Sequence, residues 1–487
     1  MNKNVLLTLA IVSITAVMFA DGSFRFAHAQ NDADNRSPRV LTLEEYINGA
    51  IENDTAFQAI LINEMALKYQ KDLRLPARDI VLDVQGQYDF VLDQDREDPE
   101  ATIALSKLFP NLGTTVGAEY STRPSWTEAT SSSDMELYLT QPIAQNAFGR
   151  ATRLLDDIIG LENDVAKHQI VEAYEDYLAT IITAYYNWYE AYENMLIGQS
   201  SYNENVKLLD NMKERENSKI AKPVDVNKTS LQVYAKQETL IGLTETYNKT
   251  LNVITTALRY RGAERLVPKR PSMYDEVIVS FERDFKELYE NGRTFQVLKL
   301  LEEKSSLDVS KNADDLLPSI ELLVGYKIQG DEYEFESGEN MLYTGFSFSY
   351  PFFDQVERAQ HGIAKVEEEK SQITTDNVYY RLYRDIRNLA LGIEREQELL
   401  ALADEKIKLS EAVLEDETKN YTYGKITLND YIDAVNRRDN NLFNKITRIS
   451  NLKRLKIDWL RLNDKLVQRS DMSTKYQWED KPRSLFR

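Results

Sequence analysis

The chain of 487 residues contains no cysteine and only three histidines. The absence of cysteine excludes disulfides, thiol chemistry and a lipid-modified N-terminal cysteine. One histidine, His28, lies in a segment that we expect to be removed, which leaves His168 and His361. We find no Ser/His/Asp order, no metal-ligand spacing and no glycine-rich phosphate loop. We therefore expect no enzyme activity, no catalytic residue, no cofactor and no metal site.

Basic residues are also scarce, because 59 Lys and Arg oppose 79 Asp and Glu, a formal net charge of −20. Nucleic-acid binding requires a basic surface, so we expect no nucleic-acid partner. Beyond the N-terminus no apolar run reaches the ~18 residues that a transmembrane helix needs. If this chain crosses a membrane, it must therefore do so with strands.

The N-terminus has the pattern of a secretory signal peptide. Lys3 precedes an apolar run at 5–20, and the small-residue site Ala27-His28-Ala29 follows. We predict a signal peptide over residues 1–29 with cleavage before Gln30. The alternative is an uncleaved N-terminal anchor.

The remaining chain repeats one order of features. The segment IENDTAFQAILI (51–62) resembles YENGRTFQVLKL (289–300), and each is followed by Leu-Pro and then by strand-like sequence that stops at another proline. A long proline-free helical run begins after each of these prolines. The same order twice indicates an internal duplication. We therefore divide the chain into a first repeat (30–262), a second repeat (263–466) and a C-terminal tail (467–487).

The strand regions cover about 79–142 in the first repeat and about 319–351 in the second. Apolar and polar residues alternate in IVLDVQGQYDFVL (80–92), and also in MLYTGFSFSY (341–350), where we place one slip near Gly345. This pattern fits a membrane barrel and equally a water-soluble antiparallel sheet with one wet face. The first region is about twice as long as the second, so we expect a second hairpin from 101–108 and 114–121.

The long helical runs carry a 3.5-residue repeat of apolar residues, which predicts left-handed coiled coils. In the first repeat the seam comprises Tyr174, Leu178, Ile181, Tyr185, Trp188, Tyr192 and Met195. A helix from Asn146 to Lys219 would be roughly 110 Å long at ~1.5 Å per residue. Each helix then turns and returns, over 226–260 and 428–466, with tips at about 219–225 and 421–430. The fold class is α+β.

These features together resemble the TolC-type outer-membrane efflux proteins, over about 41–466. LYLTQPIAQNAFGR (137–150) is similar to the family's strand-to-helix junction, and YTYGKITLNDYIDA (421–434) to its helical tip. The resemblance implies a homotrimer with a shared transmembrane β-barrel in the outer-membrane lipid and a periplasmic α-helical coiled-coil barrel. It implies a passive export duct of a tripartite efflux or type I secretion system, docked by a periplasmic adaptor protein and driven by an inner-membrane pump.

The resemblance also implies roles for individual residues. The strand-to-helix junctions are Gln141, Pro142, Tyr350 and Pro351. The periplasmic entrance is formed by Asp225, Tyr421, Asp430 and Asp433. The adaptor-contact tips are Lys219, Ile220, Ala221, Lys222, Pro223, Val224, Gly424, Lys425, Ile426 and Thr427.

Some positions depart from the family pattern or allow another interpretation. Ile426 stands where the family's closing network can carry an arginine, and Lys219 stands where a glycine is expected. Asp430 could instead be an acid in the first turn of a helix, favoured by the helix dipole. The family usually contributes four strands per protomer, whereas six are expected here unless the extra hairpin folds outside the barrel wall. The alternative function is a periplasmic coiled-coil scaffold or adaptor without a pore. The exported substrate, and which adaptor and pump serve the duct, are left open by the sequence.

Overall fold

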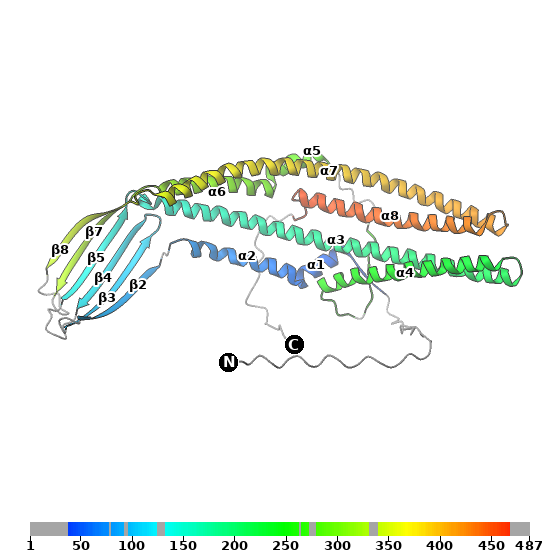
Figure 1. Ribbon diagram of the computed structural model, residues 1–487, viewed down its shortest axis with the longest axis horizontal. Coiled ribbons are helices and arrows are strands. Elements are labelled where there is room, and N and C mark those ends of the chain that lie inside the picture. Colours follow the sequence, from blue (N-terminus) through cyan, green and yellow to red (C-terminus); the bar gives the residue numbers. More distant parts are fainter. Residues whose placement is uncertain are drawn as a thin grey trace, which may run out of the picture.

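The computed structural model describes residues 38–76, 79–91, 96–123, 132–262, 264–271, 279–330 and 339–467. The expected signal peptide and all of the C-terminal tail beyond residue 467 lie outside these ranges. The described chain is elongated, with a sheet at one end and two helical hairpins at the other (Figure 1). Among the described residues, no helix is long and apolar enough to cross a membrane.

The duplication is visible in the lengths of the helices. Helices α3 (Arg150–Asn217) and α7 (Gln355–Thr422) each have 68 residues. Their return helices, α4 (Pro223–Ala257) and α8 (Leu428–Leu462), each have 35 residues. Helix α3 therefore lies inside the range predicted for it, from Asn146 to Lys219. Helix α4 begins three residues earlier than the sequence suggested. The two repeats share one helical design.

Shorter helices pack along the halves of α3 and α7 that lie nearest the sheet. These are α1 (Leu43–Asn53) and α2 (Thr55–Arg74) in the first repeat, and α5 (Phe281–Asn291) and α6 (Arg293–Asp314) in the second. Helix α1 starts at a capping box in which Thr42 and Glu45 bond each other's backbone N–H groups. A small parallel ladder joins β1 (Arg39–Leu41) to β6 (Leu266–Pro268).

Two hydrophobic cores follow the coiled-coil seams. Trp188 and Tyr185 on α3 are almost fully buried, and Tyr185 stacks on Tyr46 of α1 at a ring distance of 5.9 Å. Ile386 and Ile393 on α7 are buried with Trp459 of α8. Glu396, on α7 close to Ile393, is 4% exposed and accepts two hydrogen bonds from Arg448 of α8. This ion pair gives the buried carboxylate a charged partner.

One antiparallel sheet contains strands from both repeats, in the order β2-β3-β4-β5-β7-β8. The strands are β2 (Ile80–Val91), β3 (Arg96–Phe109), β4 (Thr114–Arg123), β5 (Ser132–Pro142), β7 (Ser319–Gly330) and β8 (Asn340–Ser349). The expected extra hairpin therefore exists and belongs to this sheet. The open edges of the sheet are β2 and β8.

The slip expected near Gly345 is wrong. Strand β8 pairs with β7 without interruption from Asn340 to Ser349. Tyr343 consequently lies on the face opposite Phe346 and Phe348. Its ring covers Gly325 on β7, where a Cβ would meet the tyrosine ring at 2.2 Å. Gly325 leaves space for the Tyr343 ring. The aromatic residue on the second face of β8 is therefore accommodated by packing, and the strand needs no bulge.

The helices form a layer whose edges are α4 and α7. Away from the sheet the order is α4-α3-α8-α7, because α3 packs against both α4 and α8, and α7 packs against α8 (Figure 1). Helix α7 exposes apolar side chains mostly seven or eleven residues apart, and α4 exposes a similar set. The exposed apolar side chains on α7 include Val356, Ile363, Val366, Ile373, Tyr380, Leu391, Leu402 and Leu409, and those on α4 include Leu231, Tyr234, Ile241 and Val253.

Candidate functional site at the helical tips and the strand-to-helix junctions

The two tips have the same turn geometry. Gly424 has φ +68°, and Lys219, at the equivalent position of the first repeat, has φ +58°. In both tips the next residue's N–H bonds back to the helix, from Lys425 to Asn420 at 2.9 Å and from Ile220 to Arg215 at 2.8 Å. A left-handed residue at this place ends the helix whether or not it is glycine. Lys219 therefore adopts the conformation that the missing glycine would have adopted.

Tyr421 is held between the two hairpins. Its hydroxyl donates to the Met212 sulfur at 3.1 Å, and its ring stacks on Tyr431 at 5.2 Å. The guanidinium of Arg215, on α3, lies over the same ring at 5.3 Å. Burial raises the pKa of the Tyr421 hydroxyl, while the positive charge of Arg215 opposes that shift. This position thus joins α7 to α3.

Arg215 and Met212 were not identified from the sequence. Ile426 occupies the position where the family's closing network can carry an arginine, and Arg215 of the first repeat places a cation over the Tyr421 ring. Met212 is 1% exposed, which is unusual so near a helix tip. No local pattern indicates this contact, because Met212 and Tyr421 are 209 residues apart in the chain.

Asp430 serves as a helix-capping acid. Its carboxylate accepts from the Thr427 backbone N–H at 3.0 Å and from the Thr427 hydroxyl at 2.7 Å. These hydrogen bonds hold the pKa of the Asp430 carboxyl below its usual value. The interpretation of Asp430 as an acid in the first turn of a helix thus has a structural basis. Asp433, one turn later, is exposed as well. An entrance role of either acid remains a proposal.

Asp225 occupies the same place in the first repeat without a capping box. Lys222 is the N-cap residue of α4 and makes no side-chain cap bond, and Pro223 is the first helical residue. Asp225 is half-buried and close enough to influence the titration of Tyr421. Asp225 therefore lies within electrostatic range of the Tyr421 hydroxyl, whose pKa its charge raises. Asp430 and Asp433 stay on the exposed side of α8.

The remaining tip residues form the exposed turns. Ile220 is 69% exposed and Val224 is 51% exposed, so apolar side chains face outward at the first tip. Lys222, Pro223, Gly424, Lys425 and Thr427 are exposed too, and Ala221 and Ile426 are half-buried.

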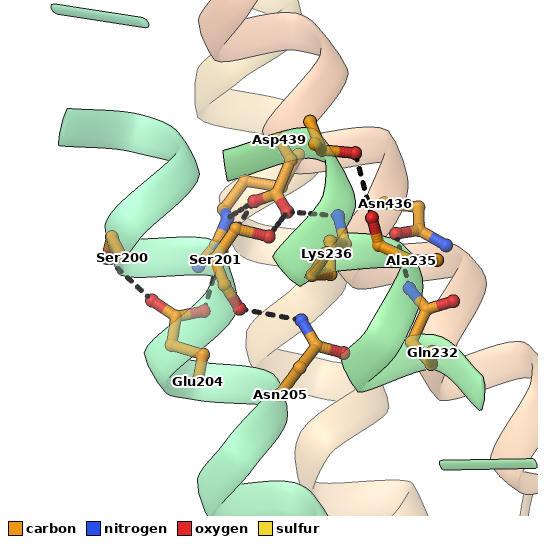
Figure 2. A network of polar contacts seen from close by, with 11 residues as sticks. Ser200, Ser201, Glu204, Asn205, Gln232, Ala235, Lys236, Asn436 and Asp439 are labelled. Atoms are coloured by element: carbon orange, nitrogen blue, oxygen red, sulfur yellow. Dashed lines mark hydrogen bonds and ion pairs between the residues drawn. The ribbon is translucent and has the colours of Figure 1, made fainter. Parts of the chain in front are cut away.

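A second set of contacts between the hairpins is a polar network around Asp439 (Figure 2). Lys236, its member on α4, lies roughly 20 Å from the start of that helix, at ~1.5 Å per residue. Asp439 of α8 is 1% exposed and accepts from Ser201 of α3 and from Lys236 of α4, the latter at 2.9 Å. Arg438 donates to the other Asp439 oxygen at 2.7 Å and to Glu204 at 2.7 Å. One buried carboxylate thus connects three helices.

Burial alone would raise the pKa of the Asp439 carboxyl, but the hydrogen bonds from Ser201, Arg438 and Lys236 outweigh it and lower the pKa. Gln232 of α4 adds a bond to Asn436 of α8 at 3.0 Å (Figure 2). Sequence reasoning missed this network, because Ser201, Lys236 and Asp439 lie on three different helices.

At the first junction, Gln141 and Pro142 end strand β5. The Gln141 amide donates to the Leu112 carbonyl at 3.0 Å and accepts from the Thr114 hydroxyl. Pro142 pairs with Glu321 of β7. The side chain of Gln141 therefore fastens the β3–β4 turn to the place where the chain leaves the sheet.

At the second junction, Tyr350 and Pro351 follow strand β8. The Tyr350 hydroxyl donates to Asp354 at 3.2 Å, and Asp354 also pairs with Arg358 at 2.7 Å. The residues before the long helices, Phe148 and Phe353, both have positive φ values, +50° and +80°. Both repeats therefore use a positive-φ phenylalanine just before the long helix.

Within the described ranges, no group of three or more His, Cys, Asp or Glu side chains is placed to hold a metal ion. No known family profile matches the chain, and no curated protein matches it in sequence.

Solved structures do match. The outer membrane protein VceC from Vibrio cholerae superimposes with a TM-score of 0.68 at 13% identity, over 86% of this chain and 95% of VceC. The Campylobacter jejuni CmeC outer membrane channel gives 0.66 at 13% identity, over 88% and 86%. The Neisseria gonorrhoeae MtrE outer membrane channel, in its open state, gives 0.65 at 12% identity, over 88% and 90%. The chain has the fold of the TolC-type outer-membrane efflux proteins.

Proposed function

We propose that this chain is one protomer of an outer-membrane channel-tunnel that serves as a passive export duct. The observation that carries the proposal is that each unpaired edge strand of the sheet lies on the same side of the molecule as an edge helix of the helical layer. Edge strand β2 and edge helix α4 lie on one side of the molecule, and β8 and α7 lie on the other (Figure 1). Both sides carry unsatisfied groups, which are backbone hydrogen-bonding groups in the sheet and exposed apolar stripes on the helices.

A second copy satisfies both sides at once. If β8 and α7 of one copy meet β2 and α4 of the next, the contact is head-to-tail, and such contacts generate a closed ring when the rotation closes. Closure also removes the free strand edges, which hydrocarbon does not tolerate. The number of copies, three, comes from the resemblance to the family.

The apolar face of the sheet supports placement in the outer membrane. Leu82, Phe346 and Leu342 are 62%, 78% and 78% exposed, although each is large and apolar. Strands of 10–14 residues are long enough for a tilted membrane strand, which needs about 9–11 residues. The helical hairpins would then extend into the periplasm.

The tips are the proposed entrance and docking surface. Three copies would bring Asp225, Tyr421, Asp430 and Asp433 around one axis, where the aspartate carboxylates would focus a negative potential. The exposed turns at 219–224 and 424–427 would contact a periplasmic adaptor, and an inner-membrane pump would supply the energy. The cargo is set by these partners.

Fractionation and bilayer recording test this proposal together. We expect a heat-modifiable trimer in the outer-membrane fraction, ion conductance in planar bilayers, and crosslinks to an adaptor from Ile220 or Lys425. A water-soluble periplasmic dimer without conductance would instead identify a coiled-coil scaffold and would contradict the channel.

A further inference from the structure

The hairpin of β2 and β3 continues the two faces of the sheet without a break. One row of paired residues crosses all six strands: Leu82, Leu105, Ala118, Leu137, Tyr326 and Leu342. Every member is apolar, and all except Ala118 are large side chains more than a third exposed. The apolar face therefore extends from one edge strand to the other.

The next row lies on the opposite face and has the opposite character. It consists of Asp83, Ala104, Glu119, Glu136, Lys327 and Met341. Successive residues of a strand point to opposite faces, so these two rows separate an apolar side from a largely polar one. Strand β2 obeys the same alternation as β5 and β7, as a wall strand in a membrane barrel must.

The turn between β3 and β4 is also built into the strand-to-helix junction. Arg153 of α3 donates to the Asn111 carbonyl at 2.6 Å, and Gln141 donates to the Leu112 carbonyl at 3.0 Å. Gly113 and Gly149 meet so closely that a Cβ on Gly149 would lie 2.5 Å from the Pro110 carbonyl oxygen. These contacts fix the height of the turn and hold β3 in line with β4.

If only four strands of each copy lay in the wall, the pair at the edge of the sheet, β2 and β3, would have to lie outside it. That arrangement conflicts with the observed geometry. It would require β4 to exchange its pairing with β3, which runs from Ala101 to Phe109, for a strand of another copy. It would also leave Leu82 and Leu105 on a free hairpin exposed to water. Neither cost arises if the hairpin stays in the sheet.

We infer that all six strands of each copy lie in the barrel wall, so that three copies form an eighteen-stranded barrel with a wide aqueous lumen. The inference rests on the proposed channel function. At a strand spacing of ~4.8 Å and a tilt of ~40°, eighteen strands enclose a backbone diameter of roughly 36 Å. Four strands per copy would enclose roughly 24 Å. The outer opening then accepts bulky hydrophilic cargo, such as a compact peptide roughly 20 Å across, after allowance for side chains.

Cysteine labelling tests the position of the hairpin, because the natural chain has no cysteine. Leu82→Cys and Asp83→Cys probe β2, and Tyr326→Cys and Lys327→Cys probe β7 as the reference wall strand. In proteoliposomes a membrane-impermeant maleimide should label Asp83→Cys and Lys327→Cys at least tenfold faster than their neighbours.

Comparing β2 with β7 distinguishes a failure of the inference from a failure of the proposed channel function. If β7 alternates and both β2 positions react equally, the hairpin lies outside the wall and the inference is overturned while the channel stands. If β7 shows no alternation either, the membrane barrel itself is wrong.

Polymer exclusion tests the width independently. Poly(ethylene glycol) is added only to the side of the hairpin loops, so that the helical end does not limit entry. The lumen cross-section should exceed that of a twelve-stranded barrel about 2.3-fold, since diameter grows with strand number. Polymers roughly 20 Å across should therefore enter and lower the conductance. Their exclusion would overturn the inference, whereas a lack of conductance would contradict the proposed function.

Discussion

Arg215 of α3 lies over the ring of Tyr421 of α7, with 5.3 Å from the guanidinium carbon to the ring centroid. This contact joins the tips of the two repeats, and it does so with a cation that comes from the first repeat. A half-buried cation–π contact is worth about 1 kcal/mol, enough to shift a balance between two arrangements of a tip several-fold.

We therefore expect Arg215→Ala to loosen the proposed entrance and raise the single-channel conductance several-fold. Lys213→Ala is the matched control, because Lys213 lies on the same helix and makes only an exposed contact to Asp210. Equal conductance of Arg215→Ala and the natural protein would show that this contact does not restrict the duct.

The role of Asp430 as a helix cap and the roles of Asp430 and Asp433 as charges at the entrance can be tested separately. Asp430→Asn removes the charge but keeps an oxygen that can accept from Thr427, so the helix start should survive. If Asp430 and Asp433 line the entrance, Asp430→Asn and Asp433→Asn should each weaken block by divalent cations in bilayer recordings. Asp385→Asn, in the middle of α7, serves as the control. Unchanged block in both variants would leave Asp430 as a capping residue only.

Asp439 should make a large contribution to the stability of the paired hairpins. Asp439→Asn leaves Lys236 and Arg438 without their shared carboxylate and should destabilise the fold by about 3 kcal/mol. Chemical unfolding followed by circular dichroism measures the change. Glu405→Gln removes an exposed partner of Lys408 and should leave the unfolding midpoint unchanged.

The same carboxylate predicts a dependence on pH. The pKa of Asp439 is lowered in the folded chain, so its stabilising effect is present above its unfolded pKa of about 3.9. It is lost as the pH falls through the folded pKa. The stability gap between the natural protein and Asp439→Asn should thus close in acid. A constant gap from pH 7 to pH 2 would contradict the paired, ionised state.

Gly149 should not tolerate a side chain. It has φ +75°, and an added Cβ would meet backbone atoms of Pro110 and Asn111. Gly149→Ala should cost about 2 kcal/mol from the left-handed conformation alone, with more from the clash. We expect a lower yield of heat-resistant oligomer on gels. Gly160→Ala, within α3 and with open space around it, is the control and should be neutral or slightly stabilising.

The polar face of the sheet predicts the ion preference of the lumen. Its described acidic residues include Asp83, Glu119 and Glu136, and Glu119 stands directly opposite Glu136. A reversal potential measured across a KCl gradient should show selectivity for K⁺ over Cl⁻. Glu119→Gln should reduce it, whereas Glu415→Gln on α7 should not. Anion selectivity would indicate that this face does not line the pore.

Much of the fold could be predicted from the sequence, because it depends on repeated local patterns. Heptad spacing placed Tyr185 and Trp188 in a buried seam, and Pro142 and Pro351 marked the ends of the two strand regions, with β5 ending at Pro142 and β8 shortly before Pro351. The doubled length of the first strand region predicted a further hairpin, and the sheet contains it. Alternation misled only at Tyr343, because the glycine that accommodates this ring lies on another strand.

The sequence by itself determined the periodic elements, the duplication and the lack of a long apolar run beyond the N-terminus, since each rests on patterns along the chain. Only the tertiary structure decided which distant residues meet. It placed Arg215 on Tyr421, gathered Ser201 and Lys236 around Asp439, and set the hairpin of β2 and β3 in register with the sheet. These contacts join segments that no local propensity connects, because they depend on how helices and strands pack after they have formed.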